Sequence, residues 1–205
     1  MGQVLEPASV DSMLAVQFSD PGAATGYGIG FSLAELDGHR ATIVTDPGIR
    51  AAGHVDRALE AFGGTSIETC VFDGVEENPT TEHVDAGTRF AAQHDIDFIV
   101  GLGGGSAMDA GKTIAFMAGQ KRPLWDFEDF GDNWKRAETD AIAPIVAVPT
   151  TSGTGSADGR PTVVINEDTE TKQIPFPPQL TPALVTCAPV RAPAPPPPLP
   201  RPHPR

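Results

Sequence analysis

Cysteine, basic residues and long apolar runs are all scarce in this chain of 205 residues. Its two cysteines, Cys70 and Cys187, are too few for a disulfide framework or a cysteine-rich metal site. No apolar run reaches the roughly 18 residues that a membrane-spanning helix needs, and the first residues lack a basic and then apolar signal region. We therefore expect a reducing, cytoplasmic location and no membrane partner.

Positive charge is scarce as well, because 14 Lys and Arg face 27 Asp and Glu and the net charge is −13. The last 31 residues hold three Arg and no acidic residue, so residues 1–174 carry 11 basic residues and all 27 acidic ones. The excess of acidic residues in residues 1–174 argues against nucleic acid as the partner. It does not exclude phosphate binding at a local site, because backbone N–H groups bind phosphate without net charge.

Proline marks a boundary near the C-terminus, since 13 of the 21 prolines lie in residues 175–205. A segment with so few N–H donors forms neither a helix nor a central strand, and we expect it to be extended or disordered. We therefore predict an α/β domain over residues 1–174 and a proline-rich tail over residues 175–205. The Ala, Arg and Pro content of the tail is typical of GC-rich DNA read in a shifted frame. The alternative is a proline-rich ligand for a partner domain.

Apolar periodicity changes repeatedly between the strand and helix patterns along residues 41–166. Alternating strands and helices predict βαβ units, and hence a Rossmann-like parallel sheet with flanking helices. The expected strands lie at 41–46, 66–75, 96–103 and 143–149, with one more in a hairpin at 162–166, and the expected helices lie at 55–62, within 78–93 and at 106–119.

The segments that follow the four predicted parallel strands are rich in Gly, Thr, Asn or Asp. They are Thr45–Gly48, Gly74–Asn78, Gly101–Ser106 and Pro149–Ser156. Ligands of open α/β sheets bind at the carboxyl ends of the strands, where these segments meet. Together they predict a binding site at that edge.

The stretch DFIVGLGGGSAMDAGKT, residues 97–113, resembles two phosphate-binding motifs without matching either. A triphosphate loop needs glycine where Ser106 stands, and it places Gly-Lys-Thr at the start of a helix rather than inside it. The dinucleotide fingerprint ends here in serine instead of glycine. A strand, a glycine turn and a helix N-terminus still suit a diphosphate. The alternative is a tight turn that needs glycine only for its backbone angles.

Two acidic residues near these strand ends each have two interpretations. Asp46 is placed to accept hydrogen bonds from a ribose diol and to repel a 2′-phosphate, which favours NAD over NADP. It is equally suited to an Asx turn before Pro47. Asp109 lies three residues after Ser106, close to the glycine turn, in the first turns of the predicted helix. The alternative interpretation is that this acid only stabilises the helix dipole.

Four motifs, taken in order, are similar to those of the iron-dependent (group III) alcohol dehydrogenases. They are TDPG at 45–48, ENPTTE at 77–82, DFIVGLGGGSAMDAGK at 97–112 and VPTTSGTGS at 148–156. The resemblance covers roughly residues 20–185. It implies an α/β domain that binds NAD, followed in the family by an all-helical domain that holds Fe(II) through one Asp and three His. It also implies hydride transfer between an alcohol or aldehyde and the nicotinamide cofactor.

Carried over by motif, the resemblance implies cofactor contacts but no catalytic residue and no metal ligand in this chain. The implied contacts in the four motifs are Asp46, Asn78, Gly103, Gly104, Gly105, Ser106, Asp109, Thr150, Thr151 and Thr154. The downstream stretch VVINEDTETK, residues 163–172, resembles the next hairpin of the family and adds Val163 and Lys172. None of the five histidines has a partner at helical spacing, so we expect the metal domain to be missing from a truncated or frameshifted chain.

Two functions follow from these observations. The first is the cofactor-binding half of an NAD-dependent alcohol dehydrogenase, inactive alone and prone to self-association through faces that the missing domain would cover. The second is a noncatalytic nucleotide-binding or interaction module whose proline-rich tail docks a partner.

Overall fold

The computed structural model describes residues 39–63, 65–128, 130–151, 159, 161–173 and 180–185. Within them, one parallel sheet has the strand order β2-β1-β3-β4-β7. The strands are β1 (Arg40–Val44), β2 (Glu68–Phe72), β3 (Phe98–Gly103), β4 (Ile145–Pro149) and β7 (Leu184–Val185). The predicted Rossmann-like α/β fold is confirmed.

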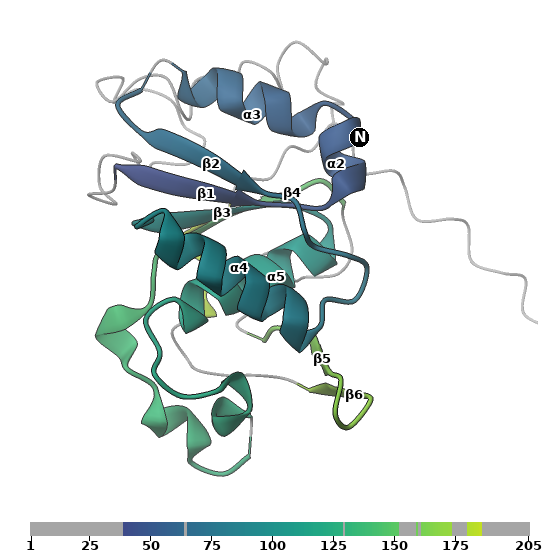
Figure 1. Ribbon diagram of the computed structural model, residues 1–205, viewed down its shortest axis with the longest axis vertical. Helices are drawn as coiled ribbons and strands as arrows, with labels where there is room; N and C mark the ends of the chain where they lie inside the picture. The colour runs from purple at the N-terminus through teal and green to yellow at the C-terminus, as the bar shows by residue number, and fades with distance from the viewer. Residues whose placement is uncertain are drawn as a thin grey trace, which may run out of the picture.

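Helices cover both faces of the sheet, as Figure 1 shows: α2 and α3 lie on one side, and α4 and α5 on the other. Their bounds are α2 (Pro47–Ala51), α3 (His54–Phe62), α4 (Thr81–Gln93) and α5 (Gly105–Met117). Strand β3 is buried at all six residues. Its Val100 packs with Val55 and Phe62 of α3, whereas Ile99 packs with Ile114 of α5. A central strand that alternates between two covered faces needs a continuous apolar run.

The short helix α2 is a feature that the sequence pattern did not predict. The sequence pattern predicts a strand that ends at residue 46, but β1 ends at Val44 and Pro47 opens α2. Proline suits the first turn of a helix because its missing N–H has no intrahelical partner there. Asp46 is the N-cap of α2, and its Oδ1 accepts a hydrogen bond from the Ile49 N–H at 3.0 Å.

The polar segment between α5 and β4 forms three short 3-10 helices, at Leu124–Phe127, Asn133–Arg136 and Thr139–Ala141. None of the helices in the described part of the chain is both long and apolar enough to cross a membrane.

A hairpin and a fifth parallel strand complete the described structure. The hairpin consists of β5 (Val164–Asn166) and β6 (Thr171–Gln173), which pair antiparallel as expected. Strand β7 pairs in parallel with Val146 and Ala147 of β4, and Leu180 just before it is buried. Leu184 and Val185 thus join the sheet, although they lie beyond residue 174, where the sequence pattern predicts the α/β domain to end. Local composition hides this strand, since it is two residues long and its pairing partner lies far away in the sequence. Residues 186–205 lie outside the described residues.

Candidate functional site

The carboxyl ends of β1, β3 and β4 meet at one edge of the sheet because these strands are parallel neighbours. The chain passes from β1 outward to β2 and then returns to the other side of β1 to form β3. Ligands of open α/β sheets bind outside the strand ends at such a reversal of strand order. Asp46 follows β1, Gly104 follows β3 and Thr150 follows β4, so the topology gathers three predicted residues at this edge.

The backbone conformation at position 103, the last residue of β3, requires glycine. Its φ is 148°, a value that residues with a Cβ rarely adopt. A Cβ at this position would lie 2.8 Å from the Cβ of Ala107 and 3.3 Å from Oδ2 of Asp46. The carbonyl oxygen of Gly103 accepts a hydrogen bond from the N–H of Thr150 at 2.8 Å. The glycine turn therefore lies close to Asp46 after β1 and is hydrogen-bonded to Thr150 after β4.

Gly104 keeps space open in front of helix α5. It is the N-cap residue, with an ordinary φ of −81° and no side-chain capping hydrogen bond. Among the described residues, the nearest atom to a Cβ built here would be Oγ1 of Thr151, at 3.6 Å. The N–H groups at the start of a helix, together with the helix dipole, attract anions. The geometry therefore suits a diphosphate at Gly104, Gly105 and Ser106.

Two threonines at the same strand ends carry buried hydroxyls that lack a hydrogen-bond partner within the described residues. They are Thr45 after β1 and Thr150 after β4. A buried polar group without a partner costs about 1–3 kcal/mol. Polar atoms of a ligand at this edge would remove that cost, so the two hydroxyls fit a nucleotide better than an empty turn.

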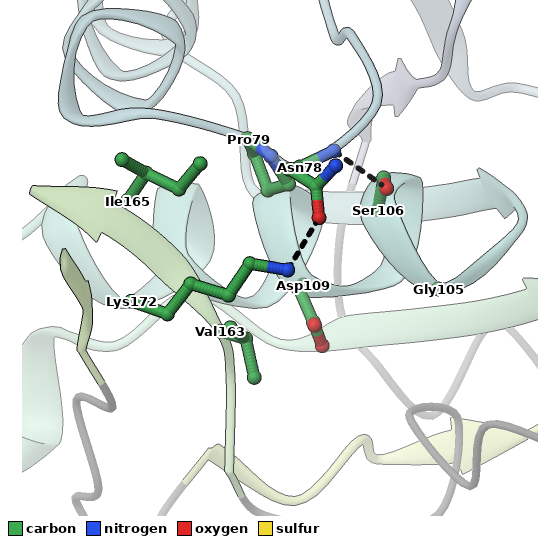
Figure 2. Close-up of a pocket in the computed structure, with 8 residues that line it drawn as sticks. All are labelled: Asn78, Pro79, Gly105, Ser106, Asp109, Val163, Ile165 and Lys172. Carbon is green, nitrogen blue, oxygen red and sulfur yellow. Dashed lines mark hydrogen bonds between the residues drawn. The ribbon is translucent and has the colours of Figure 1, made fainter. Parts of the chain in front are cut away.

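A pocket of about 230 Å³ lies beside the start of α5. Figure 2 shows its lining residues, which come from the loop after β2, from α5 and from the hairpin. Six were predicted as cofactor contacts and two, Pro79 and Ile165, were not; the full lining is Asn78, Pro79, Gly105, Ser106, Asp109, Val163, Ile165 and Lys172. Residues that are distant in the sequence thus form one cavity.

Asn78 links the three elements that form this pocket. Its φ of 58° is left-handed, a region that asparagine tolerates better than most residues. Its backbone N–H donates a hydrogen bond to Oγ of Ser106 at 3.2 Å. Nζ of Lys172 donates to Oδ1 of Asn78 at 2.6 Å, and Figure 2 shows Lys172 reaching across from the hairpin.

The hairpin is held in place by hydrogen bonds and a β-bridge to residues 79–81, at the start of α4. The N–H of Ile165 donates to the carbonyl oxygen of Pro79 at 2.8 Å. The Thr81 hydroxyl donates to the carbonyl oxygen of Ile165 at 3.3 Å, and Thr80 forms a parallel bridge with Ile165. Lys172 and Val163 therefore reach the pocket from a docked hairpin.

The other predicted residues that the structure describes lie outside the pocket lining. Asp46 makes a local capping contact at the start of α2, which agrees with the interpretation of a local turn. It also lies beside the glycine turn, where a carboxylate that binds a ribose diol would have to lie. Thr150 and Thr151 stand at the end of β4. Thr154 lies outside the described residues.

Lys112 is a buried charged residue that was not predicted as a site residue. Its side chain is fully buried, and its Nζ donates to the carbonyl oxygens of Gly159 at 3.1 Å and Pro161 at 2.8 Å. Oδ1 of Asp109 lies 3.5 Å from Nζ. Burial lowers the pKa of Lys112, and Asp109 partly opposes that shift. The signal in the sequence was a lysine three residues after an aspartate in an otherwise apolar helix.

Iron does not fit the residues that the structure describes. They contain no group of three or more His, Cys, Asp or Glu side chains placed to hold a metal ion. A nicotinamide nucleotide fits them better, since the glycine turn and the pocket both lie at the start of α5, and Thr45 and Thr150 carry hydroxyls without a described partner at the same edge of the sheet.

Comparison with known proteins identifies one family. The family model described as iron-containing alcohol dehydrogenase matches residues 22–189. The chain is 37% identical over 159 residues to 1,3-propanediol dehydrogenase of Klebsiella pneumoniae, which covers 77% of this chain and 39% of the relative. It is 34% identical over 143 residues to choline dehydrogenase of Bacillus subtilis, covering 70% of this chain and 35% of the relative. The chain thus spans little more than a third of the length of these relatives.

A solved structure supports the same relationship. Sulfoacetaldehyde reductase from Bifidobacterium kashiwanohense, in complex with NAD⁺, superposes with a TM-score of 0.66 at 28% sequence identity. The similar region covers 75% of this chain and 39% of that protein.

Proposed function

Because the chain belongs to the iron-containing alcohol dehydrogenase family, we propose that its α/β domain binds NAD(H) as the cofactor half of a hydride-transferring enzyme. The observation that carries this proposal is the pocket in which Asn78, the start of α5 and Lys172 converge. A nucleotide at this position would lie against the N-terminus of α5, where its pyrophosphate is favoured by the helix dipole.

Each predicted residue has a role in this proposal. Gly103, Gly104, Gly105 and Ser106 cradle the pyrophosphate, with Asp109 beneath it. Asn78, Val163 and Lys172 hold the adenosine side. Thr150, Thr151 and Thr154 line the cleft toward the nicotinamide.

The choice between NAD and NADP depends on Asp46. One of its carboxylate oxygens caps α2, and the other, Oδ2, lies 3.3 Å from where a Cβ on Gly103 would stand. A carboxylate there suits the two hydroxyls of an NAD ribose and repels the 2′-phosphate of NADP. We therefore propose that NAD(H) binds more tightly than NADP(H).

We propose that this chain alone oxidises alcohols negligibly. The nicotinamide ring supplies the hydride chemistry when the cofactor is bound. In this proposal the described residues bind the cofactor, and they contain no group of three or more His, Cys, Asp or Glu side chains placed to hold a metal ion. A small alcohol or aldehyde is the proposed substrate of the whole enzyme. Robust NAD-linked oxidation of alcohols by the purified chain with added Fe(II) would contradict this proposal.

Three further proposals concern the setting of the chain. Its α/β domain extends at least to Val185, since β7 pairs with β4. It acts in the cytoplasm, in keeping with two cysteines and no disulfide framework. It also self-associates. Membership of a dehydrogenase family does not favour the alternative of an interaction module that docks through its tail.

Isothermal titration calorimetry of the full chain with NADH, and in parallel with NADPH, tests the proposed function. We expect NADH to bind more tightly, and Gly104→Val to abolish binding because the side chain fills the space in front of α5. Thr139→Val, in an exposed 3-10 segment, is the matched control and should bind like the wild type. The proposal fails if neither nucleotide gives heat, or if Gly104→Val binds normally.

A further inference from the structure

Two consecutive side chains of α5, Lys112 and Thr113, hold the segment that leads into the hairpin. Both are fully buried. Nζ of Lys112 donates to the carbonyl oxygens of Gly159 and Pro161. Oγ1 of Thr113 is hydrogen-bonded to Oγ1 of Thr162 at 3.1 Å and to the carbonyl oxygen of Asp109 at 2.7 Å. Residues 159, 161 and 162 are therefore tied to the middle of α5.

This contact lies next to the pocket without being part of its lining. Val163, the residue directly after Thr162, lines the pocket, and β5 starts at Val164. Asp109, the acidic neighbour of Lys112, lines the same pocket from α5. Lys112 is thus connected to two walls of the cavity, once through Asp109 and once through the 161–163 segment.

The nature of the contact suggests positioning rather than stability alone. A buried ammonium group is costly, and a well-packed apolar residue of similar volume is often neutral or better for stability. An ammonium group, however, donates in several directions, and here two of its donors meet carbonyl oxygens two residues apart. Such a contact fixes the path of a segment that forms no strand of its own.

We propose that Lys112 and Thr113 are positioning residues that set one wall of the nucleotide pocket by holding residues 159, 161 and 162 against α5. NADH affinity then depends on two side chains that do not touch the nucleotide. The identity of the ligand rests on the proposed function, but the position of the wall does not.

The test uses the full chain in matched variants. Lys112→Met keeps the length of the side chain and removes its donors. Thr113→Val keeps the shape and removes the hydroxyl, whereas Thr113→Ser keeps the hydroxyl. Ile114→Val, at the next and equally buried position, controls for a general loss of packing in α5.

We expect Lys112→Met to weaken NADH binding by about tenfold or more and Thr113→Val by about fivefold, the size of one lost hydrogen bond. Thr113→Ser and Ile114→Val should stay within about twofold of the wild type. Amide hydrogen exchange should accelerate over residues 161–173 in Lys112→Met and Thr113→Val, while exchange in β1 and β3 stays unchanged.

Each outcome decides a separate question. The proposal is overturned if Lys112→Met and Thr113→Val bind NADH like the wild type, if exchange over residues 161–173 does not change, or if Ile114→Val weakens binding as much. If the wild type does not bind NADH at all, the proposed function fails, and the exchange measurement alone tests the position of the wall. If Lys112→Met does not fold, the comparison of Thr113→Val with Thr113→Ser remains decisive.

Discussion

The two ends of the neighbouring strands β1 and β3 differ in how fully the protein satisfies its own polar groups. At the amino ends, Oδ2 of Asp97 accepts hydrogen bonds from the N–H groups of His39 at 2.6 Å and Arg40 at 2.8 Å. The N–H of Asp97 in turn donates to the carbonyl oxygen of Arg40 at 2.8 Å. At the carboxyl ends, the Thr45 hydroxyl is buried with no partner among the described residues.

This contrast separates an end that holds the fold from an end that is suited to a ligand. Buried polar groups in folded proteins are almost always hydrogen-bonded, so a buried hydroxyl without a partner needs an explanation. Here it belongs to the residue directly after β1, at the edge of the sheet where ligands of α/β sheets bind. Substitutions at the amino end should therefore change stability alone, and several at the carboxyl end should change nucleotide binding alone.

The largest expected effect is at Gly103, where the fold and the site coincide. Gly103→Ala places a Cβ on a backbone with φ of 148° and 2.8 Å from the Cβ of Ala107. We expect a loss of about 2–3 kcal/mol in the free energy of unfolding, measured by urea denaturation. Gly104→Ala, with an ordinary φ, should lose less than about 1 kcal/mol. Equal losses in both variants would contradict the assignment of strain to Gly103.

The next effect in size is at Lys172, which contributes to the pocket and little to the fold. Lys172→Met removes the hydrogen bond to Asn78 and a positive charge at the pocket. We expect a loss of NADH affinity of about tenfold, or about 1.4 kcal/mol. The free energy of unfolding should change by less than about 0.5 kcal/mol, because the residue is exposed.

Lys121→Met is the matched control for Lys172. Lys121 is an exposed lysine that pairs with Glu138 in the segment after α5, outside the pocket lining. It should leave NADH affinity unchanged at fixed ionic strength. If the two lysine variants lost affinity equally, the effect would come from net charge and not from the pocket.

Asp97→Asn tests the amino end, and its effect is on stability alone. The N–H of His39, and then that of Arg40, lowers the pKa of Asp97 below its ordinary value of 3.8, although partial burial opposes the shift. A carboxyl whose pKa is lower in the folded state stabilises the protein above pH 3.8, and that stabilisation is lost as the pH falls through the folded-state pKa.

We therefore expect Asp97→Asn to reduce the free energy of unfolding by about 0.5–1 kcal/mol near neutral pH, a small value because the side chain is exposed. The difference from the wild type should shrink as the pH falls below 3.8. NADH affinity at neutral pH should not change. A constant difference across the pH range would show that the charge of Asp97 does not cause the effect.

The same contrast explains which parts of the molecule the sequence predicts. Strand β3 and helix α5 carry their own periodicity, and the glycine turn lies between them in continuous sequence, so all three were predicted closely. Strand β7 was missed because a strand of two residues has no detectable periodicity. It is a strand only because it pairs with β4, which is distant in the sequence.

Contacts between residues that are distant in the sequence were not predicted. Asn78 and Lys172 are 94 residues apart in sequence and meet in one hydrogen bond. Nothing in the local pattern around either residue indicates that contact, and the family resemblance implied only that each of the two residues contacts the cofactor. Lys112 was not singled out because its importance lies in two carbonyl oxygens that no side-chain pattern reveals.

The smallest effect is expected at Thr45, and it gives the most direct test of the contrast between the two ends. Thr42 and Thr45 both lie on or next to β1 and are both buried, but Oγ1 of Thr42 is 2.9 Å from Sγ of Cys70, whereas Oγ1 of Thr45 has no partner in the described part of the chain. Thr42→Val should cost about 0.5–1 kcal/mol in the free energy of unfolding. Thr45→Val should cost less than about 0.5 kcal/mol or stabilise the protein, because it removes a hydroxyl that folding leaves unsatisfied.

Nucleotide binding should reverse that order. Thr42→Val should bind NADH like the wild type, and Thr45→Val should bind about twofold to fivefold more weakly, because the nucleotide then loses a hydrogen-bonding partner. Calorimetry on both variants measures this difference. If Thr45→Val proved as costly to stability as Thr42→Val and harmless to binding, the buried hydroxyl would belong to the fold, and the distinction between the two strand ends would lose its clearest support.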